Sequence, residues 1–274
     1  MRILFPLFVL FLTSCKHNNI DANDHPIESQ KESRLVKTMT IKEGSLIPYS
    51  FHFFYNGQNK IEKILSSNDS YAFYFTYRDD SHIKIERVLG NNEAEDSLVF
   101  TFSNGHITML EEYNDVLGSP YSYKQTVEYK YDYSGNLIKL NFYRGENFKY
   151  SGTVTYDLSG NPEEVADESG FLKYQYKYGQ NAYRIFPHNE YVVPALDLLL
   201  TFHLSESQPV ENYFLPFMHE IATISQIRAN KMGTTCTLSY QHDQSGYISS
   251  INYTFHYPAG NEMVSIYSFE YETR

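Results

Sequence analysis

One unit recurs along this 274-residue chain and restricts the fold more than any other feature. Its clearest copy is Tyr129–Leu140, YKYDYSGNLIKL. Tyr129 and Tyr131 alternate with charged residues, which is the two-residue period of a strand with one buried face. Asp132 can hydrogen-bond to its own backbone, and the Gly-Asn pair after it tolerates positive φ, so a turn follows. Apolar residues alternate again after the turn, and the unit therefore predicts a β-hairpin.

Degenerate copies of this unit follow one another at intervals of roughly 20–30 residues. They lie at 51–64, 71–85, 98–109, 127–142 and 154–162, with a further one starting at 172. Asn-Gly and Gly-Asn steps between alternating apolar runs are strong hairpin signals. The rhythm returns at 235–257 and ends in a last strand at 266–271. The pattern predicts an all-β fold, an antiparallel meander of hairpins.

The rhythm stops between Phe186 and Arg228, where four prolines fall. Leucines at 196, 199 and 200 share one helical face, which predicts a short helix packed on the sheet. Residues 218–227 could form a second helix that turns into a strand. We therefore expect a helical or irregular insertion at about 187–228, acting as a plug or cap over apolar sheet.

The first residues have the marks of a secretory signal. A positive start precedes the apolar run 3–12, and small residues lead to Cys15. This arrangement resembles the lipobox of bacterial lipoproteins, in which the cysteine carries the acyl chains and becomes the first residue. An ordinary signal peptide that contains a cysteine is the alternative. The resemblance implies a signal peptide at 1–14 and attachment to the membrane through acyl chains such as palmitate on Cys15, each buried methylene contributing about 0.8 kcal/mol.

A polar segment without apolar period follows Cys15, so residues 15–34 are expected to be a lipidated, disordered tether. Residues 35–274 then form a single domain. Cys236 is the only other cysteine, so an acylated Cys15 leaves no intrachain disulfide. Stability must come from burial, and the 26 Tyr and 19 Phe suit half-buried strands.

The net charge of −11 argues against nucleic acid, which needs a clustered Lys/Arg surface. The same charge disfavours attraction to anionic lipid, so the anchor on Cys15 is the expected membrane contact. The apolar stretch 192–200 is too short for a transmembrane helix and contains Pro194 and Asp197.

The unit at 131–137, YDYSGNL, closely matches the repeat of the YD/RHS proteins, and 156–162 nearly so. Taken with the lipobox, the tether, the proline-rich interruption and a closing hairpin at 240–247, the chain resembles Bacteroidetes lipoproteins of unknown function with a porin-like fold. That resemblance implies an antiparallel sheet curled into an open or partly open barrel, anchored at the outer membrane of a Gram-negative bacterium. It leaves open whether the domain faces the periplasm or the cell surface. It implies no catalytic residues.

Motifs for catalysis are weak. His219-Glu220 begins like a zinc-binding HExxH helix, but Thr223 stands where the second histidine should be. Histidines at 188 and 242 fall in predicted turns and are read as solvated polar residues. We expect no enzyme, no metal and no cofactor. Asp96-Ser97-Leu98 resembles the sites at which Bacteroidetes O-glycosylate exported proteins, so Ser97 is a candidate glycosylation site.

The leading functional hypothesis is a non-catalytic binding or scaffold module of the cell envelope. A curled sheet rich in Tyr and Phe would offer its concave face to an apolar or amphipathic ligand, a lipid or a glycan. The alternative is a structural or adhesive surface protein whose partner is another envelope protein.

Overall fold

The computed structural model describes residues 34–67, 71–90, 94–114, 123–168, 170–181, 219–228 and 231–274. The predicted signal peptide, Cys15, the tether up to residue 33 and the helix predicted near residue 200 lie outside these residues. Among the described residues, every regular element is a β-strand. None of them belongs to a helix long and apolar enough to cross a membrane.

The strands of the described ranges follow one another along the chain. They are β1 (Arg34–Glu43), β2 (Tyr49–Tyr55), β3 (Ile61–Ser66), β4 (Tyr71–Asp79), β5 (His82–Leu89), β6 (Ala94–Ser103), β7 (His106–Asn114), β8 (Tyr123–Tyr131), β9 (Leu137–Arg144), β10 (Asn147–Tyr156), β11 (Pro162–Asp167), β12 (Gly170–Asn181), β13 (His219–Arg228), β14 (Lys231–His242), β15 (Ile248–His256) and β16 (Glu262–Thr273). Each strand pairs antiparallel with its neighbours in sequence, which confirms the predicted hairpin meander.

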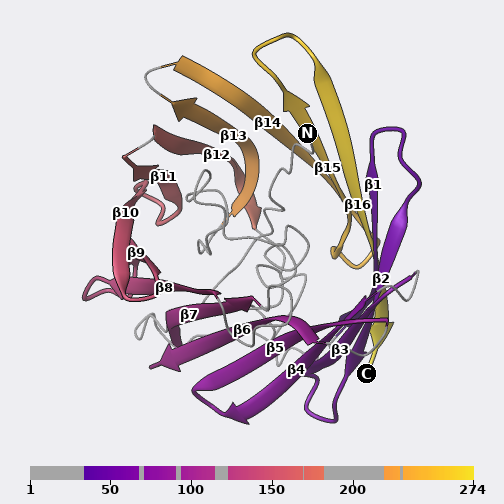
Figure 1. The fold of residues 1–274 in the computed structure, drawn as a ribbon. Coiled ribbons are helices and arrows are strands. Elements are labelled where there is room, and N and C mark those ends of the chain that lie inside the picture. Colours follow the sequence, from indigo (N-terminus) through magenta and orange to yellow (C-terminus); the bar gives the residue numbers. More distant parts are fainter. Residues whose placement is uncertain are drawn as a thin grey trace, which may run out of the picture.

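The sheet closes on itself because β1 pairs with β16. The paired residues run from Arg34↔Thr273 to Glu43↔Ser265, so the seam extends along the whole of β1. Figure 1 shows the first strand beside the last, indigo next to yellow. The barrel therefore goes one step further than the open or partly open barrel expected from sequence. Closure satisfies the two edges that an open sheet would expose.

The predicted insertion ends earlier than expected. His219–Arg228 form strand β13, paired with β12 and β14, where a helix turning into a strand was predicted. Ile221 and Ile224 are three residues apart, a spacing that fits a helix, but a register shift next to Tyr176 inserts an extra residue between them. A bulged strand thus keeps both isoleucines buried.

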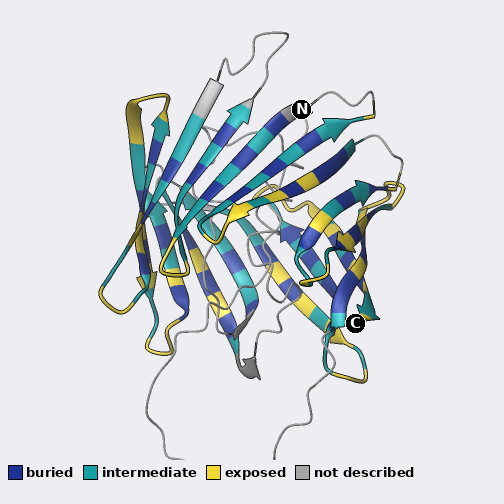
Figure 2. Cartoon of the chain, turned by 90° about the horizontal axis from the view of Figure 1, so that it is seen from below, coloured by how far each residue is buried: buried dark blue, intermediate teal, exposed yellow. Residues whose placement is uncertain are grey.

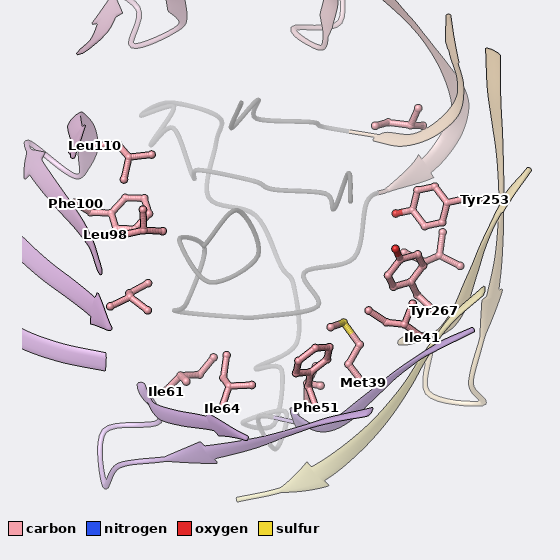
Figure 3. Close-up of a cluster of buried hydrophobic side chains, with 14 of the residues drawn as sticks. Met39, Ile41, Phe51, Ile61, Ile64, Leu98, Phe100, Leu110, Tyr253 and Tyr267 are labelled. Carbon is pink, nitrogen blue, oxygen red and sulfur yellow. The ribbon is translucent and has the colours of Figure 1, made fainter. Parts of the chain in front are cut away.

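Alternation of buried and exposed residues along the strands matches the sequence pattern (Figure 2). The buried apolar side chains form one cluster. Figure 3 shows its labelled members, among them Met39, Phe51, Ile64, Phe100 and Tyr253, pointing into the barrel. The apolar face of the sheet is therefore the inner face.

The Asp-x-Ser-Gly-Asn turns are held by the aspartate. Asp132 Oδ1 accepts hydrogen bonds from the backbone amides of Ser134 (2.8 Å) and Asn136 (2.9 Å). Gly135 takes φ +84°, a value that glycine adopts without strain. Asp157 and Asp243 accept the equivalent amides, and Asn56 does the same in the β2–β3 turn.

A set of tyrosines ties each of several hairpins to its neighbour. In each case the hydroxyl of a tyrosine in the second half of an even-numbered strand donates to a backbone carbonyl near the start of the preceding strand. We call them the latch tyrosines: Tyr55 to Val36, Tyr77 to Ile61, Tyr131 to Ile107, Tyr156 to Leu137, Tyr176 to Pro162 and Tyr271 to Ile248, at 2.5–2.9 Å. Each bond contributes about 0.5–1.5 kcal/mol. The Tyr-Asp pair of the repeat is thereby explained: the tyrosine joins two strands and the aspartate holds the turn.

Two arginines, Arg34 at the start of β1 and Arg274 just after β16, reinforce the seam between these strands. Arg34 pairs with Asp243 and lies 5.1 Å above the Tyr247 ring. Arg274 donates to the carbonyl of Tyr55 (3.2 Å) and lies over its ring. Burial acts to raise the pKa of Asp243, but the Tyr247 amide and the Arg34 guanidinium outweigh it and the pKa is lowered. These contacts bridge strands that are far apart in sequence.

Candidate binding site on the inner wall of the barrel

The inner wall is defined by register from the residues labelled in Figure 3. Leu110 points inward and pairs directly with Val127, and residues opposite each other in a ladder share a face. Val127, and Tyr129 two residues further, are therefore inward. Both are buried, at 0% and 3% exposure. The wall over most of its described area consists of such aliphatic and aromatic side chains.

The outer wall carries charge. Exposed charged side chains alternate with the buried ones along many of the described strands: Lys37, Lys42, Glu62, Lys130, Lys139, Lys173 and Glu270. A barrel that spans a membrane has the opposite arrangement, with an apolar band outside, and a lysine in the middle of that band costs about 2–4 kcal/mol. The outer face of this barrel suits contact with water.

Three charged side chains interrupt the apolar inner wall on β5, β6 and β7. Ile85 pairs with the inward Leu98, so Arg87 and Asp96 are inward too. Glu112 follows Leu110 by two residues on the same face. The three are 1%, 7% and 5% exposed, and Arg87 Nη2 lies 2.5 Å from Asp96 Oδ2. We call Arg87, Asp96 and Glu112 the inner charged cluster.

Sequence reasoning missed this cluster, although a signal was present. Each member stands at a position where the two-residue period predicts an apolar side chain, after Ile83-x-Ile85, before Leu98 or after Leu110. A charge in an apolar register is buried only when it is paired. The two-residue period therefore predicts that these side chains point to the same side as their apolar neighbours. Only the register of β5 and β6 shows that Arg87 and Asp96 meet.

The inner wall offers no reactive thiol at its cysteine. Cys236 is 6% exposed on β14, and burial raises the pKa of its thiol to about 12. The thiol thus stays protonated at neutral pH, where a nucleophile or metal ligand needs the thiolate. Among the described residues, no three His, Cys, Asp or Glu side chains gather as metal ligands.

The residues singled out from sequence are placed as follows. Ser97 is partly exposed on β6 and points outward, opposite to its neighbours Asp96 and Leu98. His219 and Glu220 belong to strand β13, not to a helix. His242 is exposed at the end of β14, and His188 lies outside the described residues. Ser97 and His242 lie on strands that are not neighbours in the barrel.

Comparison with known proteins gives a fold and no family. No protein-family model and no curated protein matches the chain. Solved structures with a similar fold include two porin-like proteins. A porin-like protein from Bacteroides uniformis has a TM-score of 0.59 at 11% identity, over 86% of this chain and 96% of the other. A porin-like protein from Bacteroides vulgatus has a TM-score of 0.57 at 15% identity, over 88% and 99%.

At this identity the likeness shows a shared fold alone. The porin-like fold predicted from sequence is confirmed. Kinship with the lipoprotein family and with YD/RHS repeats remains a prediction, as does the lipid anchor. The apolar inner face and the charged outer face are properties of this chain's own side chains and are not taken from the comparison.

Proposed function

We propose that this protein is a non-catalytic binding module of the cell envelope that holds an apolar or amphipathic ligand inside its barrel. The observation that carries the proposal is the polarity of the wall, apolar inside and charged outside. An apolar inner wall can bind an apolar ligand and shield it from water, whereas a pore needs a polar interior. Barrels with about sixteen strands are wide enough to leave room beyond their own wall side chains.

The anchor completes the proposal. Acyl chains on Cys15 would hold the protein at the outer membrane, and residues 16–33 would let the barrel move up to about 60 Å from it. A barrel with a water-compatible outside can then exchange a ligand with the membrane. We propose the anchor from the lipobox alone, and a Cys15→Ala variant tests it: the protein should leave the membrane fraction and lose acyl label.

Mass spectrometry of extracted ligand tests the binding role. The chain from Lys16, secreted into the periplasm of a host that makes envelope lipids, should yield a lipid on solvent extraction. Val127→Thr places a hydroxyl on the inner wall at constant shape and should reduce the yield. Thr155→Val is the matched change at an exposed position on β10 and should leave it unchanged. A clean extract from well-folded protein would reject the carrier role.

A structural or adhesive role is the second candidate, and a specific surface favours it. On the outer face of β2, β3 and β4, Lys63 lies 6.0 Å from the Phe54 ring and 5.3 Å from the Tyr74 ring. Both rings are at least 40% exposed. Exposed aromatic side chains such as Phe54 and Tyr74 are of the kind enriched in protein interfaces. Crosslinking in intact membranes would yield one discrete protein adduct, lost in Phe54→Ser, if this role holds.

We further propose O-glycosylation at Ser97. Its outward direction leaves the hydroxyl accessible, whereas the buried Asp96 would be read only before the chain folds. A glycan would appear as a mass increment on the peptide containing Ser97 and disappear in Ser97→Ala. An unmodified peptide from the native host would reject it.

A further inference from the structure

Tyr129 and Tyr131 lie two residues apart on β8 and have different environments. The Tyr131 hydroxyl donates to the carbonyl of Ile107 at 2.8 Å, as a latch tyrosine. The Tyr129 hydroxyl is buried on the inner wall and has no hydrogen-bond partner in the part of the chain that the structure describes. A buried hydroxyl without a partner destabilises a folded protein.

The fold does not require a hydroxyl at this position. The position two residues before the latch tyrosine carries a buried apolar side chain in other hairpins: Phe53 on β2, Phe75 on β4, Val154 on β10 and Phe269 on β16. Tyr174 on β12 is the other tyrosine there. Phenylalanine would fill the site of Tyr129 with the same ring and no desolvated oxygen. The hydroxyl therefore has a reason outside the packing of the wall.

The surroundings of Tyr129 define what could use this hydroxyl. Its ladder partner on β9 is Leu140, fully buried, and its neighbour on the same face is Val127. Burial, and secondarily the nearby Tyr131, raises the pKa of the phenol, so the group stays a neutral donor at physiological pH. A neutral donor on an aliphatic wall suits an uncharged or singly charged oxygen acceptor at the end of an apolar chain.

We propose that the Tyr129 hydroxyl donates a hydrogen bond to the carbonyl or carboxyl oxygen of an acyl chain bound inside the barrel. This inference rests on the proposed ligand-binding function and names its ligand class and one specificity-determining residue. The chain of the ligand lies on the apolar wall around Val127 and Leu140. The acyl oxygen supplies the partner that the described residues do not provide.

Two fluorescent probes separate the polar contact from general apolar binding. cis-Parinaric acid carries a carboxyl group, and diphenylhexatriene is a hydrocarbon without an acceptor. Both are titrated against the full chain and against Tyr129→Phe. We expect the variant to bind cis-parinaric acid about 3- to 10-fold more weakly, the loss of one hydrogen bond, and diphenylhexatriene as the native chain does.

Tyr131→Phe is the matched control, because it removes a hydroxyl two residues away that the fold uses. It should lower the melting temperature and leave both probe affinities unchanged, whereas Tyr129→Phe should keep or raise the melting temperature. Equal cis-parinaric acid affinity in Tyr129→Phe and the native chain would overturn the inference and leave the proposed function standing. So would a fall in melting temperature as large as that of Tyr131→Phe. Failure of the native chain to bind either probe would reject the proposed function and the inference with it.

Discussion

The neighbouring hairpins β6–β7 and β8–β9 occupy the same place in the repeat and are built differently. Together with β5, the first places the inner charged cluster on the wall, with Arg87 and Asp96 paired. The second contributes Tyr129, Leu140 and other apolar side chains. The hairpins also touch at their turns, where the His106 ring lies 4.7 Å from the Tyr131 ring.

Their turns differ as much as their walls. β6 and β7 are joined by Asn104 and Gly105, both at positive φ, which is the two-residue hairpin connection that follows the twist of the strands. β8 and β9 are joined by a longer turn that Asp132 holds by hydrogen bonds. Phe102, next to the last residue of β6, takes the place that Tyr131 has at the end of β8, so β6 has a ring without a latch hydroxyl.

The comparison teaches which features the barrel needs. Both hairpins keep an inward ring before the turn and a residue at positive φ within it. The β6–β7 hairpin has no latch hydroxyl, no turn aspartate and no uncharged inner wall, so the fold does not require these three features in every hairpin. The inner charged cluster is thus an addition to the fold, and a costly one, because the desolvation of buried ions offsets much of their attraction.

The largest effect is expected from Arg87→Met. The substitution removes the Arg87 guanidinium from the buried Asp96 carboxylate, on the same wall as Glu112, which should lower the free energy of unfolding by about 3–5 kcal/mol. Urea unfolding measures it. The double variant Arg87→Met/Asp96→Leu makes this wall resemble that of β8–β9 and should recover most of the loss. A single variant as stable as the native chain would show that the pair carries no energetic weight.

Asp132→Ala should have the next largest effect. It removes the acceptor of the Ser134 and Asn136 amides and should cost about 1–2 kcal/mol. Asp132→Asn is the control, because Asn56 accepts the equivalent amides in its own turn, and it should stay close to native stability. The β6–β7 turn, which has no such side chain, should be unaffected in either variant by amide exchange.

Phe102→Tyr would transfer the latch to the hairpin that lacks it. The new hydroxyl should reach the carbonyl of His82 on β5, which stands in the same register to position 102 as Ile107 does to Tyr131, and stabilise the protein by about 0.5–1 kcal/mol. Thermal unfolding checks the gain. Destabilisation would mean that the β5–β6 ladder does not present that carbonyl as the other hairpins do.

The smallest effect is expected from acid. Low pH should loosen the β8–β9 turn and leave the β6–β7 turn unchanged. Backbone hydrogen bonding from Asn136 lowers the pKa of Asp132 below its ordinary value of 3.8. Because the folded pKa lies below the unfolded one, the contribution is complete above about pH 4 and is lost as pH falls through the folded pKa. Amide protection factors, which correct for the intrinsic exchange rate at each pH, should fall between pH 5 and 2 at Ser134 and Asn136, and not at Gly105. Asp132→Asn should abolish the difference.

The hairpins and their turns could be read from sequence because their causes are local. Alternation places Tyr129 and Leu140 on one face, and Asp132 and Gly135 can specify the turn without help from the rest of the chain. The strand at His219–Arg228 could not, because Ile221 and Ile224 fit a helix as well as a bulged strand. Pairing with β12 and β14 decides between them, and that pairing is not local.

The sequence by itself determined a two-faced antiparallel meander, since a period of two and Asp-Gly-Asn turns leave the chain few alternatives. Tertiary structure decided that β1 meets β16, that the apolar face is the inside, and that Arg87 lies on Asp96. The physical reason is the distance along the chain over which each interaction acts. Backbone conformation depends on residues a few positions apart, whereas closure joins Arg34 to Thr273, and only the summed twist and register of all the intervening strands bring such ends together.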